Sequence, residues 1–295
     1  MIDIANEQGK FDGNIVLVKP IEFGNLENFH KQDCQYTVSL RGRVDGEGRI
    51  INRRITSVCD AVDSYTEYEK YMGLAEIDTL RFIVSNTTEA GIVFDDTDRF
   101  ELDPPKTFPG KLTKFLYHRY KAFQGDLSKG LVMLPVELID DNGIMLHKCV
   151  LQLIDLWGLG DDFKNWVEEA CIFTSTLVDR IITGYPKATE EAEWENLGYI
   201  DRCLVTGEPF ALWVIESAKD ISRELPLPDA GLPVIYTDSK SILMTTSKGG
   251  IATDIYYSDR RATISSGVLD EEVERLRFSP DYKRMLTIES YDSSV

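Results

Sequence analysis

The sequence predicts an α/β protein built on a doubly wound, mostly parallel sheet. Two short apolar runs, residues 80–84 and 131–135, each lead into a loop of polar side chains that ends in a glycine. A segment of helical periodicity follows the second loop, through Leu146, Val150 and Ile154. Alternation of strand, polar loop and helix is typical of a parallel sheet covered by helices. Both polar loops should therefore lie along one edge of the sheet, where such folds bind ligands.

The other elements follow from apolar patterning and turn residues. The near-continuous apolar run 14–19, ended by Pro20, predicts a strand buried on both faces of a parallel sheet. A hairpin turn is expected at 44–49, between two of the strands. Further strands are predicted at 36–40, 50–58, 210–215 and 232–236, and helices at 2–7, 61–74, 111–123, 163–170 and 269–276. The segment 173–181 is predicted to be a helix or a tight turn into one.

Composition limits the classes of partner. The chain has 295 residues, enough for one large or two ordinary domains, and a formal net charge of -18. That charge repels nucleic-acid backbones and anionic membranes, so we expect neither as a partner. No apolar run approaches the roughly 18 residues that a membrane span needs, and no secretory signal is expected. Five scattered cysteines indicate reduced thiols in a cytoplasmic protein.

Chemistry-bearing motifs are few. The three histidines have no metal-ligand spacing to one another, and no P-loop or nucleophile elbow occurs. The polar loop 85–91 is either a ligand-binding edge or an ordinary turn, and the residues alone leave both open. Asp179 and Arg180 are adjacent in the chain, and the simplest interpretation is that they form a charged pair on the surface of a helix.

Five segments, in this order along the chain, resemble a known protein family. They are IVLVKP at 15–20, YTVSLRG at 36–42, FIVSNTTEAG at 82–91, PVELIDDNG at 135–143 and STLVDRIITGYP at 175–186. Together they resemble the long-chain mannitol dehydrogenase family over about residues 1–240. The TGYP form of the last segment resembles the branch of that family that acts on hexuronates, the tagaturonate reductase (altronate oxidoreductase) branch.

The resemblance implies a Rossmann-like domain and a metal-independent oxidoreductase that uses NAD. The implied reaction converts D-altronate and NAD⁺ to D-tagaturonate and NADH, so the partner is a small hexonate or hexuronate. By resemblance, a first group of residues lines the cofactor edge, and these are Ser85, Asn86, Thr87 and Glu89. A second group lies near the substrate or the domain cleft, and these are Glu137, Asn142, Val178 and Arg180. Asp179 would order the catalytic groups in a supporting role.

The sequence also departs from the family pattern. Met1 falls inside the helix that follows the family's Gly-rich loop, so we expect the sheet to lack its first strand and that loop. The family signature K-x-x-x-x-N-G-x-H is absent after Asp238, where no asparagine occurs. We therefore expect an incomplete Rossmann-like NAD-binding domain over 1–238 and a divergent tail over 239–295, in place of the family's helical domain.

Three explanations of these departures remain open. The chain is an incomplete or inactive form of a hexuronate-pathway oxidoreductase, a non-catalytic nucleotide- or partner-binding protein on a Rossmann remnant, or an enzyme whose catalytic residue comes from the tail. A sheet without its first strand would expose a central edge, which favours association or poor solubility. The sequence leaves the oligomeric state undetermined.

Overall fold

The structure is a computed structural model that describes residues 1–44, 47–88 and 90–237, together with the backbone of five short strands beyond them. The chain divides into two compact units. The first comprises 1–215 and 221–235, and the second comprises 216–220 and 236–295.

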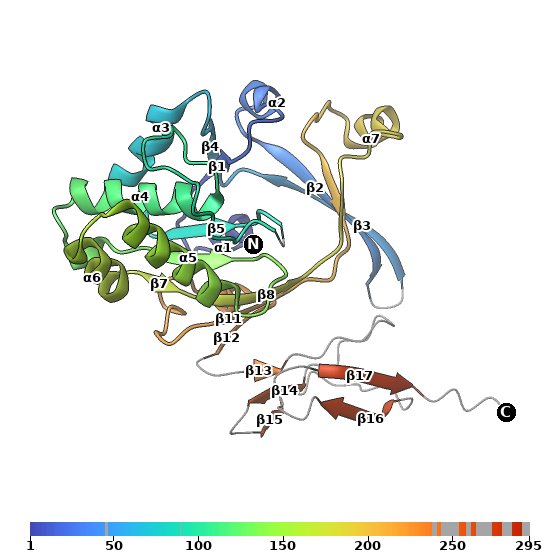
Figure 1. Ribbon diagram of the computed structural model, residues 1–295. Coiled ribbons are helices and arrows are strands. Elements are labelled where there is room, and N and C mark those ends of the chain that lie inside the picture. Colours follow the sequence, from blue (N-terminus) through green and yellow to red (C-terminus); the bar gives the residue numbers. More distant parts are fainter. Residues whose placement is uncertain are drawn as a thin grey trace. The chain divides into compact units, whose positions relative to one another are not determined.

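Helices and strands are interspersed along the first unit (Figure 1). The helices are α1 (Ile2–Glu7), α2 (Glu27–Lys31), α3 (Tyr68–Gly73), α4 (Phe108–Ala122), α5 (Asn142–Trp157), α6 (Asp161–Ala170) and α7 (Glu190–Leu197), with short 3-10 turns at Leu74–Glu76, Leu127–Lys129 and Pro228–Ala230. The strands up to Thr237 are β1 (Ile15–Lys19), β2 (Tyr36–Val44), β3 (Glu47–Ile55), β4 (Val58–Asp63), β5 (Phe82–Ser85), β6 (Val132–Pro135), β7 (Ile172–Phe173), β8 (Ser175–Asp179), β9 (Ile182–Gly184), β10 (Val205–Gly207), β11 (Leu212–Glu216) and β12 (Val234–Thr237). The second unit carries β13 (Ser241–Ile242), β14 (Asp254–Tyr257), β15 (Arg261–Thr263), β16 (Val273–Phe278) and β17 (Met285–Ser290).

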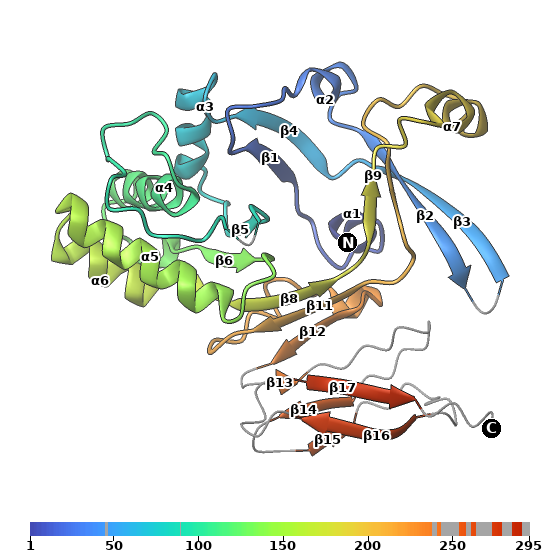
Figure 2. The same cartoon turned by 45° about the vertical axis from the view of Figure 1, so that its right-hand side comes forward.

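Parallel pairing joins the strands that lead into the predicted ligand edge. Strand β1 pairs with β4, and β5 pairs with β6, which pairs with β7, all in parallel. These two groups form separate sheets, in the orders β4-β1 and β5-β6-β7. The remaining sheets of the described chain have the orders β3-β2-β10-β9, β12-β11-β8, β13-β14-β15 and β16-β17. Figure 2 shows the β2–β3 hairpin extending away from the sheet that β5 and β6 form.

One hydrophobic core joins the two parallel sheets to the helices. Helices α4, α5 and α6 contribute Leu116, Val150 and Phe163, which are at most 1% exposed. Val16 of β1 and Ile83 of β5 both pack against this same cluster. The helix predicted at 111–123 is confirmed as α4, which buries Leu112, Phe115 and Leu116 on one face. Burial of this face, and not helix propensity alone, holds α4 in place.

Buried charges fix the two ends of α4. At its start, the fully buried Asp98 carboxylate accepts hydrogen bonds from the Thr107 backbone N–H and hydroxyl. Toward its end, the buried Arg119 guanidinium donates to the carbonyl oxygens of Ala75, Ile77, Leu80 and Lys129. Arg119 therefore ties the segment before β5 to the segment before β6.

Several sequence predictions were wrong in the described residues. The segment 173–181 is not helical, because Ser175–Asp179 is strand β8 and joins the sheet with β11. The helix predicted from residue 61 begins only at Tyr68, because the preceding residues extend β4 alongside β1. Residues 273–278, which include the end of the helix predicted at 269–276, form strand β16. Strand β1 is only partly buried, with Val18 36% exposed.

Candidate functional site

A buried carboxylate links the loops that follow β5 and β6. Glu137, which is 2% exposed, accepts hydrogen bonds from the Ser85 hydroxyl at 3.1 Å and from the Thr87 hydroxyl at 2.8 Å. The Thr87 backbone N–H also donates to it, at 2.9 Å. Parallel pairing sets this contact, since Ser85 lies opposite Pro135 in the register of β5 and β6. One carboxylate therefore holds both loops at the carboxyl ends of their strands, where open α/β sheets bind ligands.

The loop after β5 is tightly folded. Thr88 has φ of 118°, in the region that L-residues rarely adopt. Gly91 lies so close to Thr87 that an added Cβ would fall 1.9 Å from the Thr87 Oγ1 atom. The glycine that ends this polar loop is thus required by close packing on the threonine that Glu137 holds.

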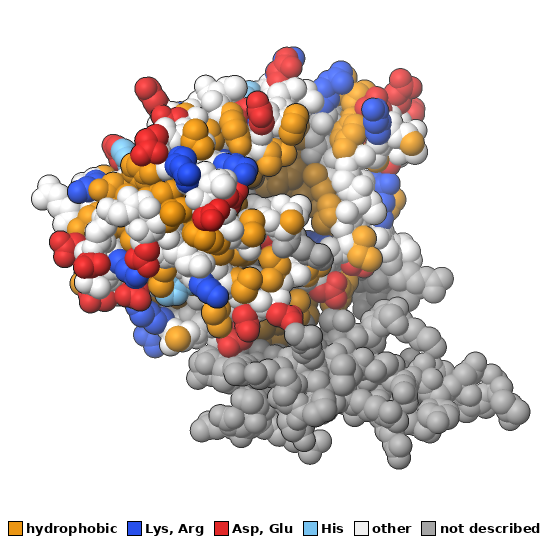
Figure 3. Space-filling model, in the orientation of Figure 1, with side chains coloured by type: hydrophobic (Ala, Val, Ile, Leu, Met, Phe, Trp, Pro, Cys, Tyr) orange, Lys and Arg blue, Asp and Glu red, His pale blue; other side chains and the backbone are white. Residues whose placement is uncertain are grey.

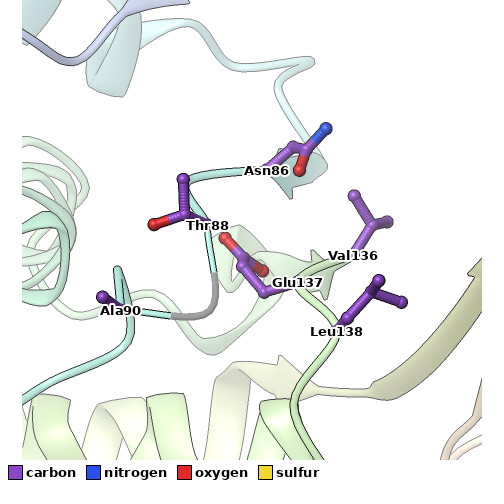
Figure 4. Close-up of a pocket in the computed structure, with 6 residues that line it drawn as sticks. All are labelled: Asn86, Thr88, Ala90, Val136, Glu137 and Leu138. Atoms are coloured by element: carbon purple, nitrogen blue, oxygen red, sulfur yellow. The ribbon is translucent and has the colours of Figure 1, made fainter. Parts of the chain in front are cut away.

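A cavity of about 480 Å³ opens beside these loops (Figure 4). Its lining residues come from both loops, and they are Asn86, Thr88, Ala90, Val136, Glu137 and Leu138. Figure 4 shows the Glu137 side chain directed toward the Thr88 side of the cavity, while Val136 and Leu138 point away from that loop. A few polar groups among apolar ones is the usual composition of a small-molecule site. Figure 3, in the orientation of Figure 1, shows a hollow with hydrophobic side chains around it.

Asn142 begins α5 and bonds to the backbone of Glu137, a residue that lines the cavity. Its side chain is fully buried and donates to the carbonyl oxygens of Pro135, Glu137 and Thr176. Its Oδ1 atom accepts from the Thr176 backbone N–H at 2.9 Å. All of its polar atoms are thus engaged within the protein, and they join the end of β6 to β8. Direct contact of Asn142 with a substrate stays a prediction.

The residues predicted at the domain cleft end strand β8. Val178, Asp179 and Arg180 are each partly exposed. The Arg180 guanidinium donates to the carbonyl oxygens of Pro209 and Phe210, and burial lowers its pKa against the opposing charge of Glu208. Arg180 therefore fastens β8 to the start of β11, a role that the sequence motif alone did not indicate.

The structure brings the predicted residues together in two groups. In the first, Ser85 and Thr87 bond to Glu137, which lines the cavity together with Asn86, and Asn142 bonds to the Glu137 carbonyl oxygen. The second group, residues 178–180, lies at the end of β8. The predicted Glu89 lies outside the described residues. Thr176 was not among the predicted site residues, although its hydroxyl also donates to the Pro135 carbonyl oxygen. The signal available was its place in the motif at 175–186, two residues before Val178.

The described part of the chain contains neither a metal-binding cluster nor a membrane-spanning helix. No group of three or more metal-ligating side chains is close enough there to hold a metal ion. No helix in the same residues combines the length and the apolar character required to cross a bilayer.

Comparisons with known proteins agree with this fold. A family model, the mannitol dehydrogenase Rossmann domain, matches residues 2–228. The chain is 44% identical over 238 residues to an altronate oxidoreductase of Phocaeicola vulgatus and 46% identical over 231 residues to one of Bacillus subtilis. These matches cover 80% and 78% of this chain but 49% and 48% of the relatives, so the chain spans about half their length.

Solved structures show the same fold at lower identity. A D-sorbitol dehydrogenase in its substrate-free form has a TM-score of 0.63 at 21% identity. A Pseudomonas fluorescens mannitol 2-dehydrogenase, solved as a ternary complex with NAD and D-mannitol, has a TM-score of 0.63 at 20% identity. Each match covers 80% of this chain and 49% of the other. The Rossmann-like fold predicted from the sequence is therefore confirmed.

Proposed function

Because this chain belongs to the mannitol dehydrogenase family, we propose that it forms the nucleotide-binding part of an NAD-dependent oxidoreductase of hexuronate catabolism. The proposed reaction is D-altronate and NAD⁺ to D-tagaturonate and NADH. The names of relatives at 44% and 46% identity support this choice of substrate over a simple sugar alcohol. Five free cysteines are consistent with a reducing compartment, and we propose the cytoplasm.

The observation that carries the proposal is the Glu137 contact with Ser85 and Thr87 beside the cavity. It fixes two loops at the carboxyl ends of parallel strands, the position where nucleotide-binding sheets hold their ligands. Asn86 and Thr88 offer polar groups to a nicotinamide carboxamide, and Val136 and Leu138 offer apolar contact to its ring. Bound NAD would supply the hydride acceptor, and these residues would orient it.

The other predicted residues take supporting places in this proposal. Asn142 holds the end of β6 under Glu137, and Arg180 holds the end of β8. Asp179, partly exposed between them, stays available to a substrate or to a catalytic group. Glu89 would join the cofactor edge with Ser85, Asn86 and Thr87.

Calorimetric titration of NAD into the purified chain tests the cofactor half of the proposal. We expect saturable binding that weakens at least fivefold in Asn86→Ala. The exposed Asn52 lies on strand β3, so Asn52→Ala is the matched control and should bind as the wild type does. Equal loss in both variants, or no binding by the wild type, would overturn the proposal.

Turnover assays with and without the remaining half of a relative separate the two candidate functions that remain. The chain lacks K-x-x-x-x-N-G-x-H, so by itself it should bind NAD and produce no altronate-dependent NADH. That outcome also fits the second candidate, a non-catalytic nucleotide- or partner-binding protein on the same fold. Altronate-dependent NADH production that is lost in Asp179→Ala would instead establish a complete enzyme. Adding the C-terminal half of a related altronate oxidoreductase to the chain distinguishes these two candidates. An incomplete enzyme should gain altronate-dependent activity, whereas a non-catalytic binding protein should not.

A further inference from the structure

Strand β1 ends in a lysine at a place where dinucleotide-binding folds usually carry an acid. In such folds an Asp or Glu at the end of the second strand bonds to a ribose hydroxyl of the adenosine half. Strand β1 follows helix α1 and pairs in parallel with β4, so it takes the place of that strand. Its last residue is Lys19, and Pro20 follows. A cation therefore stands where the ribose acceptor is expected.

The Lys19 ammonium group is engaged inside the protein. Its side chain is 9% exposed, and its Nζ atom lies 3.0 Å from a carboxylate oxygen of Asp63, at the end of β4. Nζ also donates to the carbonyl oxygens of Ile21, Glu22 and Phe23, at 2.5, 3.2 and 3.4 Å. An ammonium group has three donors, and four oxygens already surround this one. Lys19 therefore has no donor left for a ligand of its own.

These contacts decide which way the peptide groups of the loop point. In a trans peptide the C=O group and the N–H group of the next residue point in opposite directions. Because three successive carbonyl groups face the ammonium, the N–H groups of Glu22, Phe23 and Gly24 face away from it. None of these three N–H groups has a hydrogen-bond partner within the described chain. The loop therefore presents a row of three backbone donors on its outer side.

Exposed apolar side chains accompany these donors. Phe23 is 80% exposed and Ile21 is 57% exposed. An exposed aromatic ring is a surface on which a nucleobase stacks, and such stacking contributes about 1–3 kcal/mol. Donors for hydroxyl oxygens and a ring for a base are the two features that recognition of an adenosine group requires.

We propose that the loop 20–24 binds the adenosine half of the dinucleotide, and that Lys19 is the positioning residue that shapes this loop. The N–H groups of Phe23 and Gly24 donate to the ribose hydroxyl oxygens, and the Phe23 ring stacks on the adenine. Contacts from the backbone, held by Lys19, thus replace the usual contact from an acidic side chain. The inference rests on the proposed function, because it assigns the other end of the same cofactor.

Titration with adenosine monophosphate, followed by amide NMR of the full chain, tests this site without turnover. We expect the amide resonances of Glu22, Phe23 and Gly24 to shift saturably, and nicotinamide mononucleotide, which lacks adenine, to leave them in place. NAD binding that weakens in Asn86→Ala, with no shift of the three amides on addition of adenosine monophosphate, would overturn this inference alone. No NAD binding by the wild type would overturn the proposed function and this inference together.

Lysine variants separate positioning from a general structural role. Lys19→Met removes the ammonium that gathers the carbonyl groups, and it should weaken the binding of NAD and of adenosine monophosphate at least tenfold. Binding of nicotinamide mononucleotide should stay within twofold of the wild type. Lys31→Met, which removes the same charge from a side chain 65% exposed on α2, is the matched control and should change none of the three. Equal losses for all three ligands in Lys19→Met would give Lys19 a structural role only and overturn the proposal.

A glycine pair tests the loop shape if Lys19→Met fails to fold. Gly24 and Gly9 have φ of 81° and 65°, and at both an added Cβ would meet no atom within 4 Å. Alanine at either position therefore disturbs the local backbone and nothing else. Gly24→Ala should weaken adenosine monophosphate binding at least fivefold, and Gly9→Ala should stay within twofold of the wild type. Equal effects in the two variants would overturn the proposal, as would tighter binding of NADP than of NAD, which requires an ammonium that can reach the 2′-phosphate.

Discussion

The Glu137 carboxylate and Thr87, fifty residues apart in the chain, are joined by two hydrogen bonds, one from the Thr87 hydroxyl and one from its backbone N–H. Both donors reach the same oxygen, Oε1, and the Ser85 hydroxyl reaches the other, Oε2. The shape of the loop after β5 therefore depends on one side chain from the loop after β6.

Removal of this acceptor should destabilise the protein in a graded way. Glu137→Ala leaves buried donors unpaired, and we expect the free energy of unfolding to fall by roughly 2–4 kcal/mol. Glu137→Gln keeps an oxygen for Thr87, and Ser85 can turn its hydroxyl to accept, so the loss should be about 1 kcal/mol. Urea denaturation measures the free energy of unfolding of both variants. Leu138→Ala is the control, since Leu138 is 62% exposed and its replacement should have almost no effect. Equal losses in the Ala and Gln variants would contradict this account.

Close packing of α5 on β8 makes Gly143 sensitive to a single methyl group. An added Cβ would lie 1.9 Å from the Thr174 carbonyl oxygen, which is backbone and cannot move aside cheaply. We expect Gly143→Ala to lower the free energy of unfolding by roughly 1–3 kcal/mol through overpacking. At Gly73 in α3, an added Cβ would meet no atom within 4 Å, and the residue has φ of -61°. Gly73→Ala should therefore stabilise by about 0.5–1 kcal/mol, and the same sign in both variants would refute the packing argument.

Lys111 should make stability rise with pH above neutrality. Its side chain is buried, which lowers its pKa from 10.5 to about 8, against the opposing charge of Asp98. Between pH 8 and 10.5 the unfolded chain binds more protons at this site than the folded chain, so the free energy of unfolding increases with pH through that window. Across that window the free energy of unfolding should rise by a total on the order of 3 kcal/mol.

Comparison with Lys111→Met isolates this effect from other titrating groups. The variant should be more stable than the wild type at pH 7, and the gap should narrow as pH approaches 10.5. Chemical denaturation at a series of pH values measures it. A gap that stays constant from pH 7 to 10.5 would show that Lys111 titrates normally in the folded state.

Arg119 should not be replaceable by lysine. Its planar guanidinium donates to four backbone carbonyl oxygens at once, and an ammonium group has neither the reach nor the geometry to do so. We expect Arg119→Lys to reduce the free energy of unfolding by roughly 2–4 kcal/mol. Arg49→Lys, at an exposed position on β3, should change it by less than about 0.5 kcal/mol. A loss at Arg119 no larger than that at Arg49 would count against the four-carbonyl role.

The sequence predicted strands best where apolar runs were continuous. The runs that became β5 and β6 are held by a shared core, and their parallel pairing follows the alternation with helices. Strand β8 was misjudged because its Thr and Val side chains fit a helix face as well as a strand. Its pairing with β11, over thirty residues later, decides the matter, and that contact is invisible to local patterning.

The candidate site was only partly predictable for a similar reason. Resemblance placed Glu137 near a ligand, but only the β5–β6 register shows that it binds Ser85 and Thr87. Asn142 was predicted near the substrate, and this stays a prediction, while the structure adds that its side chain bonds to backbone groups of β6 and β8. Whether a polar side chain is buried, and whether all its hydrogen bonds are made within the protein, depends on the packed structure. A sequence motif alone does not show either property.

The strongly negative net charge of the chain also governs how the purified protein must be handled. With a net charge of -18, copies hold one another apart as long as their fields reach across solution. The Debye length is about 30 Å at 0.01 M ionic strength and about 8 Å at 0.15 M. Colloidal stability therefore falls as salt is added, and concentrated stocks should be kept dilute in electrolyte. Adding salt removes the electrostatic barrier while leaving exposed apolar side chains such as Leu138 unchanged, so self-association should rise with ionic strength.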